Sequence, residues 1–248
     1  MQDEPRLDHI GQQSGTEQVP PRSGNAPPTR VSGVILAGGK SRRMGRDKAL
    51  LDFAGQPLIA RVLARVQTVC SEVIIVANEH AAYAHLGARL VSDVYPGKGS
   101  LGGIFSGVLA ARAPYALVVA CDLPFLNVAL LRYLISLAPE ADVVIPRAHA
   151  PRGTARSATR YEQLDVKASG LQATHAIYSK RCLEPMRARL LANDLRIINF
   201  FDEVRVRVVE PDEVARYDPT GLTFLNVNTP EDWQTALLLM TDHSHGAT

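Results

Sequence analysis

The residues of this chain best suited to chemistry lie in a glycine-rich, basic segment that follows a short apolar run. The apolar run spans Val31 to Leu36, and the segment after it contains Gly38 and Gly39 among several lysines and arginines. Glycine has no Cβ atom, so backbone N–H groups at these positions can approach phosphate oxygens closely. Arg43 and Lys48 add positive charge where a departing pyrophosphate would lie. The segment therefore predicts a site for a nucleoside triphosphate, although a simple glycine turn with solvated cations would have the same composition.

These glycines complete neither of two common phosphate-binding motifs. Gly39-Lys40-Ser41 matches the end of a P-loop, but Val34 stands where the first glycine of that motif belongs. The Gly-x-Gly-x-x-Gly spacing of dinucleotide-binding turns is not formed in this segment either. The composition of the segment, rather than a match to either motif, supports the prediction.

An acidic residue follows a second apolar run. Residues 115–120 are almost wholly apolar, which is typical of a central parallel strand, and they lead directly to Asp122. An acid at the carboxyl end of such a strand lies in the crevice where open α/β sheets bind ligands. Mg²⁺ prefers carboxylate, water and phosphate oxygens, so one carboxylate and the substrate phosphates can hold it. Asp122 is the predicted magnesium ligand, and its structural alternative is to cap a turn before Pro124.

Two further segments carry polar groups that could contact the rest of a nucleotide or a second substrate. Asp93 begins a glycine-rich segment, 93–104, and its carboxylate could accept hydrogen bonds from a guanine ring or from ribose hydroxyls. Asn226 and Asn228 alternate along the chain, which places both amides on one face of an extended segment, where they could recognise a polar heterocycle. The alternatives are structural. Asp93 could cap a turn in a surface loop, and the two asparagines could end a strand and begin a helix.

Short β-branched runs alternate along the chain with longer segments of helical period. This order predicts βαβ units, a mainly parallel sheet and a three-layer αβα fold of the α/β class. The predicted strands are 31–36, 72–77, 89–92, 115–120, 142–145, 171–178 and 204–209, and the predicted helices are 58–69, 102–113, 128–137, 179–191 and 229–240. The segment from Pro146 to Gly170 shows no clear period and is longer than most loops in compact domains, so we expect a functional lid or disorder there.

Length and composition favour one globular domain with loose ends. A chain of 248 residues with 46% hydrophobic content can bury one large core. We expect the domain to span residues 31–241. Residues 1–30 are dominated by Pro, Gly, Gln, Ser and charge, which predicts a disordered N-terminal tail, and residues 242–248 are expected to form a flexible C-terminal tail.

Charge, hydropathy and cysteine usage exclude several function classes. The net charge of +2 is too small to indicate binding to nucleic acid or to a membrane surface, so small molecules are the expected partners. No stretch approaches the roughly 20 apolar residues that span a bilayer, and residues 1–30 lack the apolar region of a secretory signal. Cys70, Cys121 and Cys182 are widely spaced, so neither a zinc site nor a disulfide framework is indicated. These features predict a cytoplasmic protein.

Taken together, four segments of the chain resemble the molybdenum cofactor guanylyltransferase family, within the nucleotidyltransferases of Rossmann-like fold. The segments are Leu-Ala-Gly-Gly-x-Ser-x-Arg-Met-Gly-x-x-Lys at 36–48, Leu-Gly-Gly-Ile at 101–104, Cys-Asp-x-Pro-Phe at 121–125 and Asn-Val-Asn-Thr-Pro-Glu-Asp at 226–232. The resemblance implies transfer of GMP from GTP to molybdopterin-bound molybdenum, with release of pyrophosphate. It also implies Mg²⁺ as cofactor, GTP and molybdenum-molybdopterin as partners, and molybdoenzymes or their chaperones as recipients of the product.

Position by position, the resemblance implies a role for individual residues. The residues implied to contact the nucleotide are Leu36, Ala37, Gly38, Gly39, Lys48, Asn78 and Asp93. The residues implied to be catalytic are Lys48, Arg43 and Asp122, and Asp122 would also hold the metal ion. Asn226 and Asn228 would contact the pterin substrate.

Three alternatives to this reading remain open from the sequence. A cytidylyltransferase that acts on the same pterin or on a polyol phosphate is the nearest, and Gly38 speaks against it because those relatives typically have Leu-Ala-Ala-Gly in that turn. Nucleotidyl transfer to a sugar phosphate is the second. The third is a noncatalytic nucleotide-binding protein that delivers the cofactor to an apoenzyme, which would have no need for Lys48 and Asp122.

Overall fold

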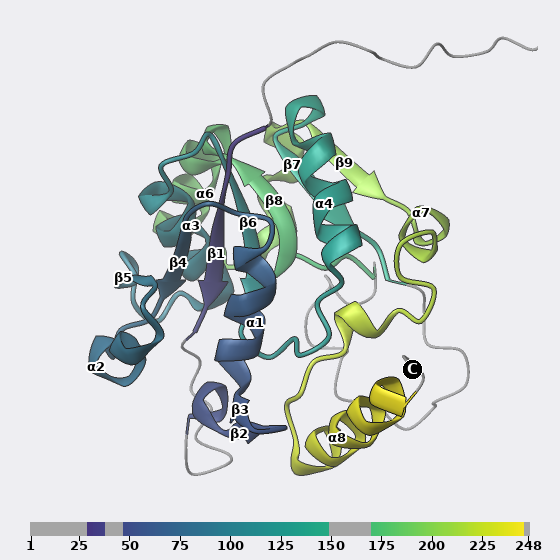
Figure 1. The fold of residues 1–248 in the computed structure, drawn as a ribbon. Helices are drawn as coiled ribbons and strands as arrows, with labels where there is room; N and C mark the ends of the chain where they lie inside the picture. The colour runs from purple at the N-terminus through teal and green to yellow at the C-terminus, as the bar shows by residue number, and fades with distance from the viewer. Residues whose placement is uncertain (1–28, 38–46, 149–169, 246–248) are drawn as a thin grey trace, which may run out of the picture.

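The computed structural model describes residues 29–37, 47–148 and 170–245, which form a seven-stranded sheet covered by helices on both faces (Figure 1). The strand order is β5-β4-β1-β6-β8-β7-β9. The strands are β1 (Val31–Leu36), β4 (Val73–Val76), β5 (Arg89–Val91), β6 (Tyr115–Ala120), β7 (Val143–Pro146), β8 (His175–Ser179) and β9 (Val206–Val209). This arrangement is the three-layer, mainly parallel α/β fold that the sequence predicts.

Parallel pairing brings the carboxyl ends of the central strands to one edge of the sheet. β1 pairs in parallel with β4 on one side and with β6 on the other, so that Leu36 lies opposite both Val76 and Ala120. β4 pairs in parallel with β5. Asn78 and Asp122 follow β4 and β6 in the chain, and they therefore lie at the edge where sheets of this kind bind ligands.

β8 is the strand whose direction the sequence pattern did not predict. It runs antiparallel to both of its neighbours, β6 and β7. It begins at His175, later than the predicted start at Leu171, and Leu171 forms only an isolated bridge with Arg147. Side chains alternate in the same way along a strand of either direction, so the apolar pattern predicts a strand here and leaves its direction open.

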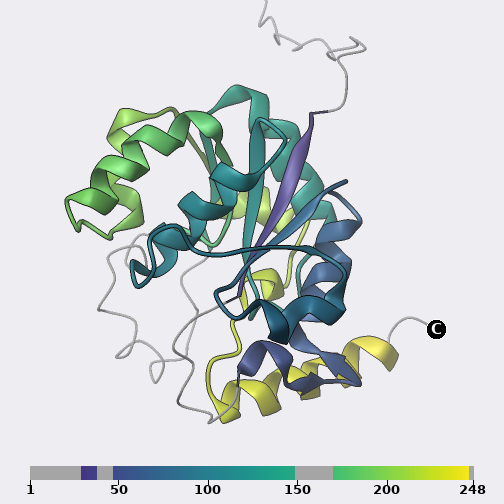
Figure 2. The ribbon, with the colours of Figure 1, turned by 90° about the vertical axis from the view of Figure 1, so that its left-hand side faces the viewer.

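Helices pack against the two faces of the sheet through separate apolar clusters. α1 (Leu58–Gln67) and α4 (Val128–Leu137) cover the face that contains Ile35 and Val119, and α3 (Gly99–Ala110) and α6 (Leu183–Leu191) cover the face that contains Val34. Gly107 lets α3 approach β1 closely, because a Cβ atom there would lie 2.3 Å from Cγ1 of Val34. Figure 2 shows these layers from the side, with the green α6 helix to the left of the sheet and the yellow α8 helix at the bottom.

The other elements are short, apart from α8 (Pro230–His245). They are the strands β2 (Asp52–Phe53) and β3 (Gln56–Pro57), the helices α2 (His80–Tyr83) and α7 (Pro211–Ala215), and the 3₁₀ turns η2 (Lys48–Leu50), η3 (Ala84–Leu86), η4 (Ala138–Glu140), η6 (Lys180–Cys182), η7 (Ile197–Glu203) and η8 (Leu222–Phe224). None of the helices in the described ranges combines the length and the apolar character that crossing a bilayer requires.

α8 packs on the β2–β3 hairpin, away from the sheet (Figure 1). The ring of Trp233 meets the ring of Phe53 edge-on, with centroids 5.3 Å apart. Leu58 and Val227 belong to the same apolar cluster, which joins the hairpin and α1 to the C-terminal part of the chain. Because Val227 belongs to this cluster, the packing of α8 on the hairpin also holds the segment just before α8.

The start of α8 agrees with the sequence, and its end lies further on. Thr229 and Asp232 cap the helix reciprocally: the Asp232 amide donates to the Thr229 hydroxyl at 3.1 Å, and the Thr229 amide donates to the Asp232 carboxylate at 2.9 Å. The helix continues to His245, beyond Asp242, where the predicted C-terminal tail begins. Neither Gly nor Pro interrupts this stretch, so nothing in it ends a helix early.

Two other predictions fall largely outside the described residues. Of the predicted N-terminal tail, residues 1–30, the structure describes only residues 29 and 30, and of the long segment from Pro146 to Gly170 it leaves out residues 149–169. Both therefore stay predictions.

Candidate active site

Three segments that are far apart in the sequence meet at the ammonium group of Lys48. Nζ of Lys48 donates a hydrogen bond of 2.7 Å to Oδ2 of Asp122 and another of 2.7 Å to Oδ1 of Asn228. A third hydrogen bond, of 3.3 Å, goes to the carbonyl of Val227. An ammonium group has three N–H donors, so these contacts use all of them. Lys48 and Asp122, which the sequence predicts to be catalytic, thus lie in direct contact.

Local structure places the two charged side chains. Lys48 is the first residue of η2, and the carboxylate of Asp47 caps this turn by accepting a hydrogen bond of 3.1 Å from the amide of Ala49. Asp122 follows β6, and the amide of Cys121 donates to the carbonyl of Leu36 at 3.2 Å, which extends the pairing with β1 past the last strand residue. The acid therefore leaves the sheet at its carboxyl edge in a defined direction.

The third segment is tied to the site through its backbone. The amide of Val227 donates to the carbonyl of Asp122 at 3.0 Å. The amide of Asn228 donates to the carboxylate of Asp232, in the first turn of α8, at 2.9 Å. The side chain of Asn228 reaches Lys48 because Asp122 holds the backbone of Val227 and the first turn of α8 holds the backbone of Asn228.

The Lys48–Asp122 pair is largely withdrawn from water. The two side chains are 14% and 12% exposed, and opposite charges attract more strongly in such surroundings than in bulk water. Oδ1 of Asp122 is buried and has no hydrogen-bond partner among the described residues. A carboxylate oxygen without a donor is costly to bury, and it is also the kind of ligand that Mg²⁺ prefers. Asp122 therefore fits the predicted role of magnesium ligand.

The described residues near Asp122 do not form a metal site with three or more protein ligands. Across the described residues, no three or more His, Cys, Asp and Glu side chains are grouped so that they could hold a metal ion. Cys121 is buried, and burial, followed by the charge of Asp122, raises the pKa of its thiol. A thiol held in its protonated form is a poor metal ligand and a poor nucleophile, which agrees with a packing role for Cys121.

A comparison with known protein families identifies the family to which the chain belongs. The model of the MobA-like NTP transferase domain matches residues 33–208, which include Lys48 and Asp122. The chain belongs to this family. It is therefore a nucleotidyltransferase with a Rossmann-like fold.

Individual relatives agree with this assignment. The chain is 36% identical over 203 residues to a probable molybdenum cofactor guanylyltransferase of Pelotomaculum thermopropionicum, covering 82% of this chain and 90% of that protein. It is 34% identical over 208 residues to the molybdenum cofactor guanylyltransferase of Desulfosudis oleivorans, covering 83% and 94%. The crystal structure of molybdopterin-guanine dinucleotide biosynthesis protein A from Archaeoglobus fulgidus has the same fold, with a TM-score of 0.68 at 20% identity over 85% of this chain and 99% of that one.

In this nucleotidyltransferase, the predicted backbone contacts at Leu36 and Ala37 involve groups that already serve the sheet. The Leu36 carbonyl accepts the hydrogen bond from Cys121, and the Ala37 amide donates to the carbonyl of Val76 at 2.9 Å. The Ala37 amide is thus used inside the protein. The Leu36 carbonyl has a second lone pair and can still accept a hydrogen bond, and the predicted nucleotide contacts at both residues stay predictions.

The predicted base and ribose contacts, Asn78 and Asp93, lie together. Oδ1 of Asn78 accepts a hydrogen bond of 3.0 Å from the amide of Asp93. Oδ1 of Asp93 accepts hydrogen bonds from the amide of Tyr95 at 3.1 Å and from the hydroxyl of Ser106 at 2.8 Å. Asp93 therefore does cap a turn, as its structural alternative predicted, and its contact with the nucleotide stays a prediction.

The glycine-rich segment after Asp93 closes a turn at the start of α3. Residues 97–102, outside the segment around Gly38 and Gly39, have the Gly-x-Gly-x-x-Gly spacing. A Cβ atom on Gly102 would lie 3.2 Å from both carboxylate oxygens of Asp93 and 3.0 Å from the carbonyl of Tyr95. The absence of a Cβ atom at Gly102 therefore allows the protein's own loop to pack closely against this glycine.

Of the remaining predicted site residues, the structure describes only Asn226. Gly38, Gly39 and Arg43 lie outside the described residues. Asn226 is half-buried and precedes Val227 in the segment that reaches Asp122. Its predicted contact with the pterin stays a prediction.

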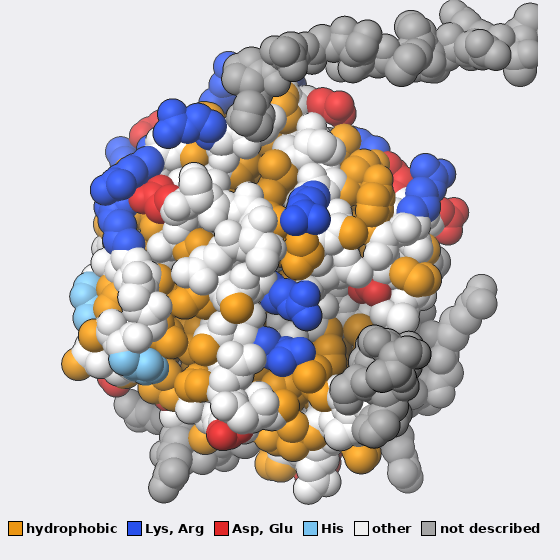
Figure 3. Space-filling model, in the orientation of Figure 1, with side chains coloured by type: hydrophobic (Ala, Val, Ile, Leu, Met, Phe, Trp, Pro, Cys, Tyr) orange, Lys and Arg blue, Asp and Glu red, His pale blue; other side chains and the backbone are white. Residues whose placement is uncertain are grey.

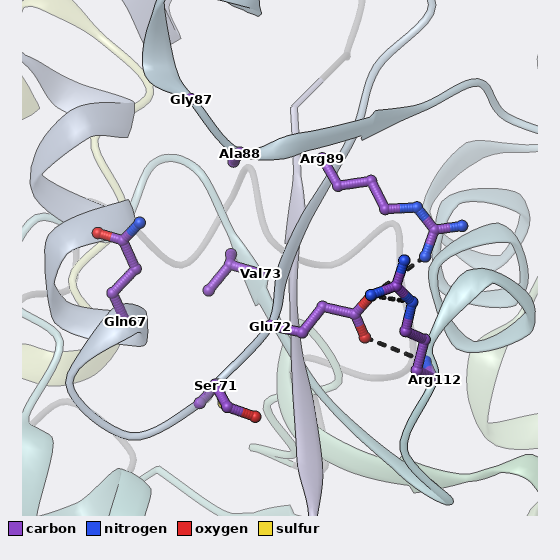
Figure 4. A pocket seen from close by; sticks show the side chains of 9 residues that line it. Gln67, Ser71, Glu72, Val73, Gly87, Ala88, Arg89 and Arg112 are labelled. Carbon is purple, nitrogen blue, oxygen red and sulfur yellow. Dashed lines mark hydrogen bonds and ion pairs between the residues drawn. The ribbon is translucent and has the colours of Figure 1, made fainter.

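A hollow of about 530 Å³ lies at the opposite edge of the sheet from Asp122 (Figure 4). Its lining includes Val73 and Arg89, the first residues of β4 and β5, whereas Asp122 follows the last residue of β6. Glu72 in its wall forms ion pairs with Arg89 at 3.1 Å and with Arg112 at 3.5 Å. These charged groups pair with one another and join the amino ends of neighbouring strands, away from the Lys48 site.

The surface gives no sign of one large basic region on the face drawn in Figure 3. Lys and Arg side chains on that face lie in several separate places, interspersed with apolar and acidic groups. The picture agrees with the small net charge of +2.

Proposed function

We propose that this chain transfers GMP from GTP to molybdopterin-bound molybdenum, releasing pyrophosphate and forming the guanine dinucleotide cofactor. The observation that carries the proposal is the contact of Lys48 with both Asp122 and Asn228 at the carboxyl edge of the sheet. The names of the relatives support the choice of GTP and of the pterin acceptor. A cytoplasmic location is proposed because all three cysteines are buried and free.

The proposed reaction needs positioning and charge stabilisation rather than a covalent nucleophile. An oxygen of the terminal phosphate of the pterin attacks the α-phosphorus of GTP, and the bond between the α- and β-phosphates breaks as pyrophosphate leaves. Enzymes accelerate such transfers mainly by aligning the groups and by stabilising the negative charge that develops. Among the described residues, Lys48 is suited to this role, because its ammonium group lies at the sheet edge and its side chain is only 14% exposed.

Lys48 has to exchange partners when the triphosphate binds. In the structure its three donors point to Asp122, Val227 and Asn228. A phosphate oxygen can replace one of these acceptors, and the remaining contacts keep the ammonium group in place. Arg43 and the glycines at 38 and 39, from the segment that leads to Lys48, are proposed to hold the departing pyrophosphate.

Asp122 is proposed to hold Mg²⁺ through its carboxylate. When bound, Mg²⁺ would neutralise charge on the phosphates and stabilise the charge that develops during transfer. The buried and unpartnered Oδ1 of Asp122 supports this assignment. Asn78 and Asp93 are proposed to contact guanine or ribose, and Asn226 and Asn228 the pterin side, with Asn228 lying next to Lys48.

One experiment tests base, reaction and acceptor together. The purified chain is mixed with Mg²⁺, molybdenum-molybdopterin and each of GTP, CTP, ATP and UTP in turn, pyrophosphate is measured and the product is identified by mass spectrometry. We expect pyrophosphate and a guanine dinucleotide with GTP, and none with a Lys48→Ala variant. A cytosine dinucleotide would overturn the proposal in favour of a cytidylyltransferase. Binding of GTP without pyrophosphate release would overturn it in favour of a protein that delivers the cofactor to molybdoenzymes or their chaperones.

A further inference from the structure

Lys48 stands on a helical turn too short to hold it by itself. η2 contains three residues, Lys48–Leu50, and a single 3₁₀ turn has little stability of its own. Ala49 is 1% exposed and anchors the turn in the core from one side. On the other side the turn depends on Asp47, whose carboxylate Oδ1 accepts from the Ala49 amide and whose carbonyl accepts from the Leu50 amide, both at 3.1 Å. The orientation of Asp47 therefore sets the direction in which Lys48 leaves the backbone.

Asp47 is in turn held by a buried tyrosine. The hydroxyl of Tyr83 donates a hydrogen bond to Oδ2 of Asp47, the carboxylate oxygen that the cap leaves unused. Tyr83 is 2% exposed and lies in the same apolar cluster as Ala49. Burial, followed by the hydrogen bond to Asp47, raises the pKa of Tyr83 well above its usual value, so the hydroxyl keeps its proton and remains a donor. Both oxygens of the Asp47 carboxylate are thus fixed from the protein side.

Tyr83 also connects two parts of the nucleotide site. It is the last residue of α2, which follows Asn78 after β4. The Asn78 side chain accepts from the amide of Asp93, so this part of the chain is joined to the other predicted base contact. The hydroxyl of Tyr83 is therefore a direct bridge between the segment assigned to the base and ribose and the turn that carries Lys48.

We infer that Tyr83 is a positioning residue for nucleotidyl transfer, acting through Asp47 to aim Lys48 at the phosphates. The inference rests on the proposed function, because it takes Lys48 as the group that stabilises the transferring phosphate. It adds a residue that has no direct contact with the substrate. Tyr83 differs in this from Asn78 and Asp93, for which contacts with the nucleotide are proposed.

The test compares two buried tyrosines. Tyr178 is also fully buried, and its hydroxyl donates to the carbonyl of Ala173 at 2.7 Å, but it lies in the apolar cluster on the opposite face of the sheet from Tyr83. Tyr83→Phe and Tyr178→Phe each remove one buried hydroxyl and keep the ring, so both should lower the melting temperature. Only Tyr83→Phe should change transfer. We expect its kcat to fall by about tenfold, since small misplacements of a catalytic group carry such costs, while KM for GTP changes less.

Variants of Asp47 provide a second, independent measurement. Asp47→Asn can still cap the turn and still meet the Tyr83 hydroxyl, and Asp47→Ala can do neither. We expect Asp47→Asn to keep most of the transfer rate and Asp47→Ala to lose as much as Tyr83→Phe or more. In the Asp47→Ala background, adding Tyr83→Phe should have no further effect on kcat, because the path through Asp47 is already broken.

The outcomes separate this inference from the proposed function. If the wild-type chain transfers GMP and Tyr83→Phe behaves as Tyr178→Phe does, the role of Tyr83 is overturned and the proposed function stands. Additive losses in the Tyr83→Phe, Asp47→Ala double variant would overturn the path through Asp47. If Tyr83→Phe does not fold, equal rates for Asp47→Asn and Asp47→Ala overturn the inference. A wild-type chain that shows no transfer with any nucleotide overturns the proposed function, and the role of Tyr83 with it.

Discussion

Lys48 and Asp122 form a partly buried ion pair, with 2.7 Å between Nζ and Oδ2, across two segments of the chain that meet only in the folded protein. Lys48 belongs to a short turn after β1, and Asp122 follows β6, the parallel neighbour of β1. The pair leaves Oδ1 of Asp122 without a hydrogen-bond partner in the described structure. This combination of a shared and an unshared carboxylate oxygen makes Asp122 the most informative residue to change.

Asp122→Asn should lower the rate of GMP transfer by at least about a hundredfold, the scale seen when one electrostatic stabiliser is lost. The amide has the same shape and still accepts a hydrogen bond from Lys48, but it carries no charge to hold Mg²⁺. Pyrophosphate release over a range of Mg²⁺ concentrations checks this. The melting temperature of the variant serves as the control for folding. Wild-type rates at low Mg²⁺ would rule out the role of Asp122 as metal ligand.

Asn228→Ala should weaken transfer by about ten- to a hundredfold, because it removes a hydrogen bond to a charged donor, which is typically worth about 1.5–3 kcal/mol. Asn228 accepts from Lys48 at 2.7 Å, and no such contact joins Asn226 to Lys48. Asn226→Ala is therefore the matched control for losing an amide in this segment. We expect it to leave the dissociation constant of GTP unchanged and to raise only KM for the pterin, measured by calorimetry and by initial rates. Equal effects of the two variants on GTP binding would show that the Lys48 contact has no special importance.

Stability should fall at acidic pH because of His175. This residue is fully buried, neither of its ring nitrogens has a hydrogen-bond partner among the described residues, and its ring packs edge-on against Phe224 with centroids 5.1 Å apart. Burial lowers the pKa of His175 to about 4, from an ordinary value of 6.5, because the charged form is poorly solvated there. The folded state thus binds the proton less tightly than the unfolded state does. The stability is complete above pH 6.5 and is lost as the pH falls toward 4, by up to about 3 kcal/mol at about 1.4 kcal/mol per pKa unit.

His175→Phe tests the cause of that acid sensitivity. A phenyl ring keeps the packing against Phe224 and cannot take up a proton, so the free energy of unfolding should change less between pH 6.5 and 4 than it does in the wild type. Urea unfolding at several pH values measures this. The exposed His80, which contacts the hydroxyl of Ser92, provides the control for replacing a histidine outside the core, as His80→Gln. An unchanged acid sensitivity in His175→Phe would assign it to other groups.

The packing of α8 on the β2–β3 hairpin should affect the rate of transfer, because it holds the segment that contacts Lys48. The edge-on contact between Phe53 and Trp233 belongs to the cluster that holds Val227, whose amide and carbonyl contact Asp122 and Lys48. Phe53→Ala should therefore shift the emission of Trp233 to longer wavelength and lower the rate of transfer. Trp233 is the only tryptophan of the chain, so the tryptophan emission comes from this one position.

Phe200→Ala is the matched control for Phe53→Ala. Phe200 is as deeply buried but lies in the cluster on the α3 and α6 face of the sheet. It should cost comparable stability, about 3–5 kcal/mol for a core phenylalanine, without moving the Trp233 emission of the folded protein. If Phe53→Ala kept the wild-type emission and rate, α8 would not govern the position of Asn228.

Short-range patterns in the sequence were enough to predict most of the fold. The strands around Val31 and Tyr115 and the helix 128–137 have the predicted bounds or nearly so, because each carries a run of apolar residues with a clear period. Asp122 could be predicted for a related reason. The carboxyl end of a buried parallel strand is a binding edge in folds of this class, so its position in the chain implied its position in space.

The direction of β8 and the partners of Lys48 could not be predicted in this way. Alternation of side chains is the same for parallel and antiparallel strands, so the residues from His175 to Ser179 carry no information about direction. Asn228 lies 180 positions from Lys48, and its amide reaches the ammonium group because α8 packs on the β2–β3 hairpin. No period or local motif encodes such a contact.

The amino-acid sequence by itself thus determined which residues could do chemistry and the order of the elements that carry them, since both depend on residue types over short distances. Only the tertiary structure decided which of these residues act together. It joined Lys48 to Asp122 and Asn228, and it brought Tyr83, a buried residue with no motif of its own, into contact with Asp47, which caps the turn that carries the lysine. The physical reason is that hydrogen bonds and ion pairs depend on distances between side chains, and packing of distant segments sets those distances.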